Sequence, residues 1–159
     1  MLSKIFRVYF VIIFPMPLSA LAALSDRLRC EAHFFEAHFN LPKDYDKSKD
    51  VWYMTPEMHR LFKEPPLASY SYFKKLESAI WNLQILKPVR EKFDFLPYYE
   101  LTFLEARATS LGEVYYRFEQ KIAEQSSVQF SVDTQKPDIR FMEHRGEFDI
   151  FLYLTCNPQ

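Results

Sequence analysis

The segment CEAHFFEAHF, at positions 30–39, repeats a Glu-Ala-His-Phe unit and so brings two histidines and two glutamates together in the sequence. Imidazole and carboxylate groups serve as metal ligands and general bases. The apolar residues around them predict a helix, on which His33 and His38 would lie about 140° apart around the axis. The His-Glu-x-x-His spacing of zinc proteases is absent. We therefore predict no metal site here, although His33 and Glu36 together could supply two ligands.

A second pattern lies in residues 44–50, where side-chain oxygens occupy every other position, as they do in calcium-binding loops. The EF-hand loop also requires glycine at its sixth position and glutamate at its twelfth. This chain has Lys49 and Thr55 there. We therefore predict a solvated charged loop rather than a calcium site.

The scarcity of glycine excludes several classes of enzyme. The two glycines, Gly112 and Gly146, are 34 positions apart, whereas phosphate-binding loops and the G-x-S-x-G serine turn need closely spaced glycines. Glutamates such as Glu100 and Glu105 could act as acid and base, but their spacing alone brings no two of them together. We therefore favour a non-enzymatic protein and expect no cofactor.

Aromatic residues are unusually frequent, since 16 Phe, 10 Tyr and 2 Trp make up 18% of the chain. Several form close pairs, whose side chains diverge on both helices and strands, so that one member of each tends toward the surface. Surface Tyr and Trp are typical of protein–protein contacts because they bury a large rigid area at low entropic cost. The predicted binding residues are Trp52, Tyr53, Tyr70, Tyr72, Tyr98 and Tyr99. The alternative, that these rings border an aromatic core, stays open.

The first 22 residues have the organisation of a signal peptide. Two basic residues precede an apolar run at 8–16, and Ala20-Leu21-Ala22 has the small-x-small form that signal peptidases cleave. Two prolines interrupt the run, which is shorter than the roughly 20 apolar residues that span a bilayer. We predict cleavage after Ala22 and no stable membrane anchor thereafter. Residues 23–159 would then be a single domain in the periplasm or outside the cell.

Cys30 and Cys156, the two cysteines, lie near opposite ends of this domain. An even number of cysteines in an exported chain favours a disulfide, which would join the first predicted helix to the last predicted strand. Closing so long a loop stabilises by about 4 to 5 kcal/mol in the chain-entropy model. Cleavage of the signal also changes the formal net charge from −1 to −3 and leaves no block of like charge. Nucleic acid is therefore not an expected partner.

The predicted fold is an α+β domain, with N-terminal helices packed on a C-terminal antiparallel β-meander. Apolar residues three and four positions apart predict helices at 24–40 and 69–86, and Thr55-Pro56 predicts the start of a short helix that ends near Lys63. Strand patterns occur at 98–106, 128–132, 139–143 and 148–156.

The segment 111–125 has two interpretations. Ser110 and Glu113 have the spacing of a helix capping box, which favours a fourth helix. The alternative is a strand, in which Val114, Tyr116 and Phe118 would alternate with polar neighbours.

Size, export and the missing catalytic motifs favour an exported, non-enzymatic binding protein that engages another protein, such as an inhibitor or an immunity-type neutraliser of a secreted toxin. One alternative is a small-molecule pocket, binding or enzymatic, lined by aromatic residues. The other is a secreted effector that acts on a host.

Overall fold

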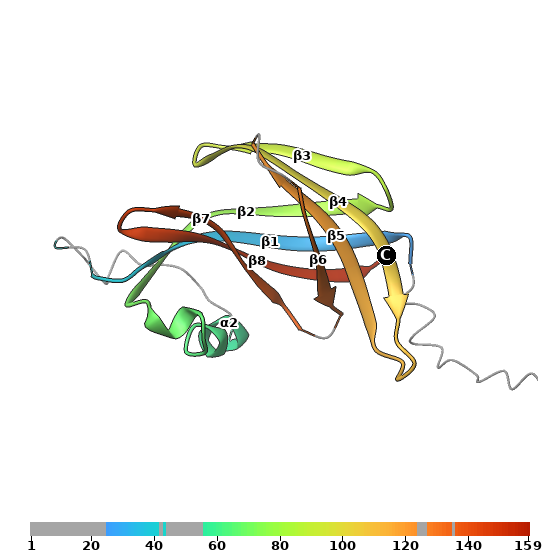
Figure 1. The fold of residues 1–159 in the computed structure, drawn as a ribbon, viewed down its shortest axis with the longest axis horizontal. Coiled ribbons are helices and arrows are strands. Elements are labelled where there is room, and N and C mark those ends of the chain that lie inside the picture. Colours follow the sequence, from blue (N-terminus) through green and yellow to red (C-terminus); the bar gives the residue numbers. More distant parts are fainter. Residues whose placement is uncertain (1–24, 42, 44–55, 124–126, 135) are drawn as a thin grey trace, which may run out of the picture.

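The computed structural model describes residues 25–41, 43, 56–123, 127–134 and 136–159. These residues form strands throughout, with one short helix and one 3₁₀ turn between the first two strands (Figure 1). The strands are β1 (Arg27–His38), β2 (Tyr72–Gln84), β3 (Pro88–Phe93), β4 (Leu96–Ala108), β5 (Val114–Ile122), β6 (Val128–Asp133), β7 (Asp138–Arg145) and β8 (Phe148–Pro158). The helix is α2 (Pro56–Leu61) and the 3₁₀ turn is η2 (Leu67–Ser69).

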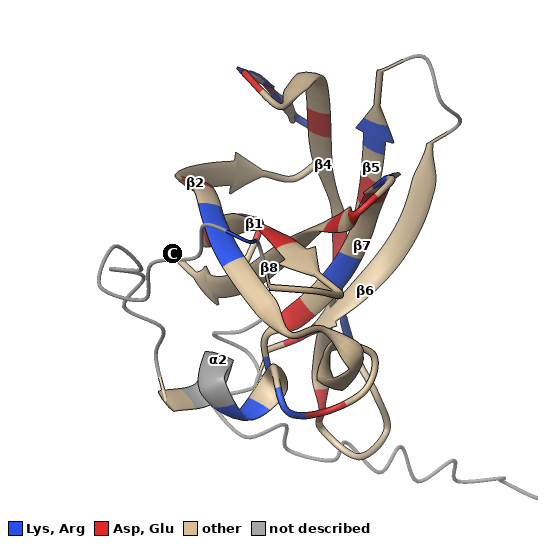
Figure 2. Cartoon of the chain, turned by 90° about the vertical axis from the view of Figure 1, so that its left-hand side faces the viewer, with Lys and Arg blue, Asp and Glu red and all other residues tan. Residues whose placement is uncertain are grey.

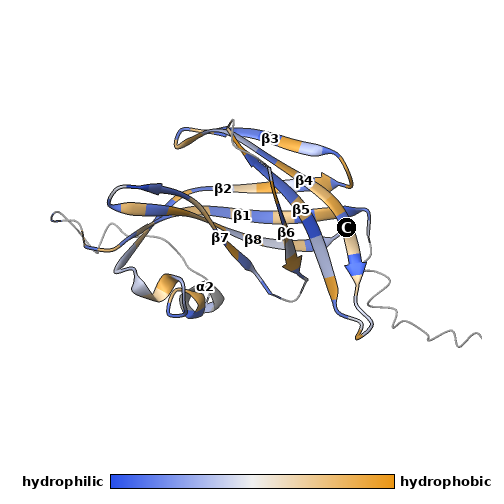
Figure 3. Ribbon diagram, viewed as in Figure 1, coloured by the Kyte–Doolittle hydropathy of each residue, from blue (hydrophilic) through white to orange (hydrophobic). Residues whose placement is uncertain are grey.

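The strands form two antiparallel sheets. Sheet A has the order β2-β1-β8-β7, and sheet B has the order β3-β4-β5-β6. Strands that follow one another in the chain pair within each sheet, and β8 returns to pair with β1 from Leu28 to His38. Hydrophobic and hydrophilic residues alternate along many of the strands (Figure 3). The inner faces of the two sheets pack on each other and form the main core.

The predicted α+β fold is therefore wrong, because residues 24–40 and 69–86 form strands and not helices. In β1 the inner face carries Leu28, Cys30, Ala32 and Phe34, while the outer face carries the buried Phe35 and Ala37. Burial of both faces in the second half of the strand adds apolar residues that break the simple alternation. As a result, some of the apolar side chains from the two faces are three or four positions apart in the sequence, which is the spacing expected of a helix.

The apolar residues of β2 have helix-like spacing for a different reason. Its register with β1 shifts where Lys75 faces Phe35 and Glu77 faces Phe34, which leaves Leu76 as an extra residue. Phe73 packs on the outer face of sheet A and Leu76 packs on the inner face. The three-residue step from Phe73 to Leu76 is therefore the ordinary change of face along a strand, and the bulge at Leu76 places Trp81 and Leu83 on the inner face as well.

The strand alternative for the segment 111–125 is correct. Val114, Tyr116 and Phe118 are buried on the inner face of β5. Ser110 and Glu113 belong to the β4–β5 turn, in which Thr109 Oγ1 accepts hydrogen bonds from the backbone N–H groups of Leu111 and Glu113. A capping-box sequence also suits such a turn, because both structures need a side-chain oxygen to bond free backbone N–H groups.

A second, smaller core lies on the outer face of sheet A. There Phe35 and Phe151 pack against Phe62, which follows α2, and against Leu67 of η2. Figure 1 shows α2 on the side of sheet A that faces away from β3 and β4. The short helix expected near Pro56 is present and begins at that residue. Phe62 and Leu67, which follow it in the chain, pack on the two central strands of sheet A, β1 and β8.

The predicted disulfide is confirmed. Cys30 of β1 and Cys156 of β8 are directly opposed in the register and are bonded to each other. The bond joins the first strand of the described chain to the last, and not a helix to a strand as predicted. Both cysteines are buried in the main core.

Candidate functional site

The residues predicted to bind a partner do not form one surface. Trp52 and Tyr53 lie outside the described residues. Tyr99 is 1% exposed and its ring stacks on Trp81 at 5.4 Å, so it belongs to the core. Tyr98 lies on the outer face of sheet B, where its hydroxyl donates to Glu100 at 2.7 Å. Of the four predicted residues that the structure describes, Tyr70 and Tyr72 are the two whose rings contact residues that line a cleft.

Tyr70 and Tyr72 flank the point where β1 ends and β2 begins. The ring of Tyr70 lies 4.6 Å from that of Phe39, the residue after β1. Tyr72 is opposite His38 in the register, with 5.3 Å between their ring centroids. The backbone N–H of Ser71 donates to the carbonyl of His38 and fixes this junction.

A cleft of about 1000 Å³ opens at this end of the molecule. One wall is the segment that follows β1, and the other is the turn between β7 and β8. The lining residues are His38, Phe39, Asn40, Leu41, Lys43, Arg145, Gly146, Glu147 and Phe148. Phe39 and Leu41, the two large apolar side chains of the segment after β1, are 44% and 54% exposed. Gly146 has a φ of 65°, and this left-handed conformation lets the chain reverse between β7 and β8.

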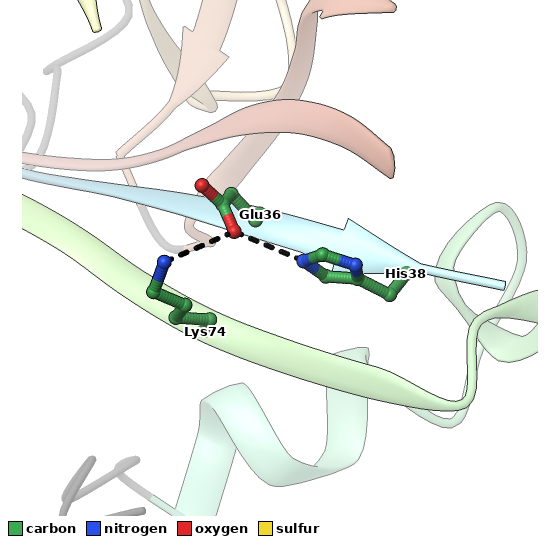
Figure 4. A network of polar contacts seen from close by, with 3 residues as sticks. All are labelled: Glu36, His38 and Lys74. Carbon is green, nitrogen blue, oxygen red and sulfur yellow. Dashed lines mark hydrogen bonds and ion pairs between the residues drawn. The ribbon is translucent and has the colours of Figure 1, made fainter. Parts of the chain in front are cut away.

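A polar network borders the cleft on the inner face of sheet A (Figure 4). One carboxylate oxygen of Glu36 lies 2.9 Å from Nε2 of His38 and 3.5 Å from Nζ of Lys74. Glu36 and His38 are only 12% and 16% exposed, so the network is largely removed from water. The imidazole of His38 also lies 5.0 Å from the ring of Phe148. These contacts fix the imidazole that lines the cleft.

The first Glu-Ala-His-Phe unit has a different environment. His33 lies on the outer face of sheet A, where Nδ1 is 2.7 Å from Oγ of Ser78. Burial, followed by the charge of Lys75, lowers the pKa of His33. His33 and His38 are an odd number of positions apart on one strand, so they point to opposite faces. In the described part of the chain, no three His, Cys, Asp or Glu side chains group as a metal site would need.

Asp149 is a functional candidate that the sequence analysis missed. It is 6% exposed, and its Oδ1 lies 2.6 Å from Nδ1 of His144, while Oδ2 accepts a hydrogen bond from the hydroxyl of Tyr70. Burial, the hydrogen bond to Asp149 and the charge of Asp149 raise the pKa of Tyr70. A signal was present in the sequence, because Asp149 is the single charged residue of β8 and lies among apolar neighbours.

The glutamates considered as acid and base, Glu100 and Glu105, are not among the described residues that line the cleft and lie on the outer face of sheet B. Glu100 accepts a hydrogen bond from Arg90 at 2.5 Å, and this bond, followed by that from Tyr98, lowers its pKa. Glu105 accepts a hydrogen bond from Arg117, also at 2.5 Å, which lowers its pKa. Each carboxylate is therefore held ionised by an arginine, whereas a general acid must keep a proton near neutral pH.

Charges of both signs are scattered over the strands, as the end-on view in Figure 2 shows. The disulfide is compatible with an oxidising, exported compartment. No helix in the described residues combines the length and apolar character needed to cross a membrane. Comparison of the chain with models of protein families, with curated proteins and with solved structures gives no match.

Proposed function

We propose that this chain is an exported, non-enzymatic binding protein that engages another protein and holds a segment of that partner in the cleft beside β1. The observation that carries the proposal is the exposure of Phe39 and Leu41 on the cleft wall. Large apolar side chains grouped beside a cleft lose unfavourable contact with water when a partner covers them. Export rests on the signal-like sequence of residues 1–22, and the disulfide is compatible with it.

The chemistry of the cleft supports binding rather than catalysis. Among the described residues, those that line it include one histidine and neither serine nor cysteine. The Nε2 atom of that histidine, His38, is bonded to Glu36, which is itself shared with Lys74. Tyr70 and Tyr72 support two residues of the cleft lining, since Tyr70 packs against Phe39 and Tyr72 packs beside His38. Among exported binding proteins, the small size of the chain favours an inhibitor or an immunity-type neutraliser of a secreted toxin.

The test is capture of partners by the immobilised full chain, produced with its own leader, from the producing cell and from its competitors or host. The Phe39→Ser/Leu41→Ser variant should lose the partner that the wild type retains. The matched control is Leu86→Ser/Leu111→Ser, which alters two leucines that are 69% and 85% exposed in the β2–β3 and β4–β5 turns. This control should retain the partner.

Thermal unfolding of both variants must match that of the wild type for the comparison to count. Equal capture by the two variants would contradict the placement of the partner in the cleft. A partner that is chemically altered by the protein would contradict the non-enzymatic assignment.

A further inference from the structure

The strand β6 is an edge strand, because it ends the order of sheet B and pairs only with β5 among the described strands. The end-on view in Figure 2 shows it at the right-hand margin of the molecule. Phe130 and Val132 face the main core, and Val128 on the same face is 51% exposed. Gln129 and Ser131 are exposed on the opposite face. Edge strands present backbone N–H and C=O groups without partners, to which a further strand can be added.

The hydrogen bonds of the β5–β6 ladder show which backbone groups of β6 point outward. The N–H of Thr134, the residue after β6, donates to the carbonyl of Val114 on β5. In an antiparallel ladder, pairs that exchange hydrogen bonds alternate with pairs that do not. Because the register of β5 and β6 is continuous, Gln129 and Ser131 belong to the pairs that do not. Their N–H and C=O groups therefore point away from β5, to the side where sheet B has no further described strand.

The other three edge strands of the described chain carry features that hinder the addition of a strand. β2 has a bulge at Leu76, directly after two lysines, and β7 has a bulge at Met142 among charged residues. β3 begins with Pro88, and half of its six residues are charged. In β6 the register has no bulge, and its one charged residue, Asp133, is the last of the strand. Among these edges, β6 is therefore the one best suited to pairing.

β6 is also complementary to a second copy of itself. In an antiparallel pair centred on Phe130, Val128 of each copy faces Val132 of the other, and both lie on the core-facing side of the sheet. Gln129 of each copy faces Ser131 of the other on the outer side, where neither is charged. The outward backbone groups of these facing residues are those that form hydrogen bonds, so the register and the bonding pattern agree. Pairing would also cover the exposed Val128.

Such a pair is two-fold symmetric and closes on itself. The two B sheets would form one continuous sheet with β3 at both ends. Pro88 and the charges of β3 would then hinder further growth, which limits the assembly to two copies.

We propose that the protein forms a homodimer in which β6 of one copy pairs antiparallel with β6 of the other, centred on Phe130. β6 contributes no residue to the described lining of the cleft, so this inference does not depend on the proposed protein partner. One pair of six-residue strands makes a small interface, and small interfaces are typical of weak complexes. We expect a dissociation constant on the order of 10 μM.

Sedimentation equilibrium of the chain, produced with its own leader, measures the monomer–dimer equilibrium over a range of concentrations. Ser131→Pro removes an N–H that faces the open side and leaves the hydrogen bonds to β5 in place. Proline is tolerated at such positions of edge strands. The dissociation constant of this variant should rise about tenfold or more, because each dimer loses two hydrogen bonds.

Two charge variants test the register. Gln129→Glu/Ser131→Glu places a carboxylate opposite a carboxylate in both facing pairs and should weaken the dimer by about tenfold. Gln129→Glu/Ser131→Lys, the matched control, places opposite charges there and should dimerise at least as well as the wild type. In both variants the glutamate at position 129 can accept the hydrogen bond that Arg117 donates to Gln129.

Thermal unfolding identifies any variant that does not fold, and if Ser131→Pro fails, the two charge variants decide. A wild-type chain that stays monomeric up to about 1 mM would overturn the proposal. Equal dimerisation by the two charge variants would overturn it as well, since the dimer would then use another surface. Loss of a captured partner protein, rather than of a dimer, in Ser131→Pro would assign the edge to a strand of another protein and would also overturn the homodimer.

Discussion

Cys30 and Cys156 are directly opposed on β1 and β8, so the disulfide joins the first described strand to the last across 126 positions of the sequence. The two strands pair along their whole common length. The bond therefore reinforces an existing sheet and does not link separate layers.

Replacing both cysteines, as in Cys30→Ala/Cys156→Ala, should lower the free energy of unfolding by about 2 to 5 kcal/mol, because the unfolded chain regains the freedom of a long loop. Urea-induced unfolding measures the difference, and the β-sheet circular dichroism spectrum should persist in the folded variant. Mass spectrometry of the unreduced wild type supplies the check on the bond. Two thiols open to alkylation before reduction would contradict it.

The hydrogen bond from Tyr70 to Asp149 should contribute measurably to stability, because the carboxylate that accepts it is buried. Tyr70→Phe removes the donor and should cost about 1 to 2 kcal/mol of unfolding free energy in urea. Tyr98→Phe is the matched control, since that hydroxyl also donates to a carboxylate, Glu100, but on a solvated face. A loss for Tyr98→Phe as large as that for Tyr70→Phe would show that burial of Asp149 has no special importance.

Stability should fall in alkaline solution. Burial raises the pKa values of Tyr70, Tyr99 and Tyr116 above the ordinary value of 10.0. The unfolded chain therefore releases these protons first, so stability is fully present below pH 10 and decreases as the pH rises toward the folded-state values. Urea unfolding at a series of pH values measures this slope, which should be smaller in Tyr99→Phe. An unchanged slope in that variant would contradict the assignment to Tyr99.

Gln120 is a buried amide on the inner face of β5, and its Oε1 atom has no hydrogen-bond partner among the described residues. Gln120→Leu should raise the free energy of unfolding by about 1 kcal/mol, since it removes an unsatisfied polar atom from an apolar core. Gln129→Leu, which replaces an exposed glutamine bonded to Arg117, should give no such gain. Thermal unfolding compares the two variants, and a destabilised Gln120→Leu would indicate that the amide has a partner in solution.

The candidate site was only partly accessible to sequence analysis. Tyr70 and Tyr72 were predicted as binding residues from their pairing, and each packs against a residue of the cleft lining, Tyr70 against Phe39 and Tyr72 against His38. The exposed wall residues Phe39 and Leu41 were not identified, because nothing in the sequence shows that the chain leaves the sheet at that point. Tyr99 had the same local pattern as Tyr98, and only packing against Trp81 distinguishes the buried member of the pair.

Residue types alone predicted the cysteine pair, the strands of the C-terminal third and the absence of glycine-rich phosphate loops. The tertiary structure alone decided that residues 27–38 and 72–84 are strands, because their apolar spacing suits a helix until both faces of sheet A are known to be covered. It also decided which polar side chains meet. Asp149 lies 79 positions from Tyr70, and Arg140 lies ten positions from Phe130. Contacts of this kind depend on strand register and sheet packing, which local periodicity does not specify.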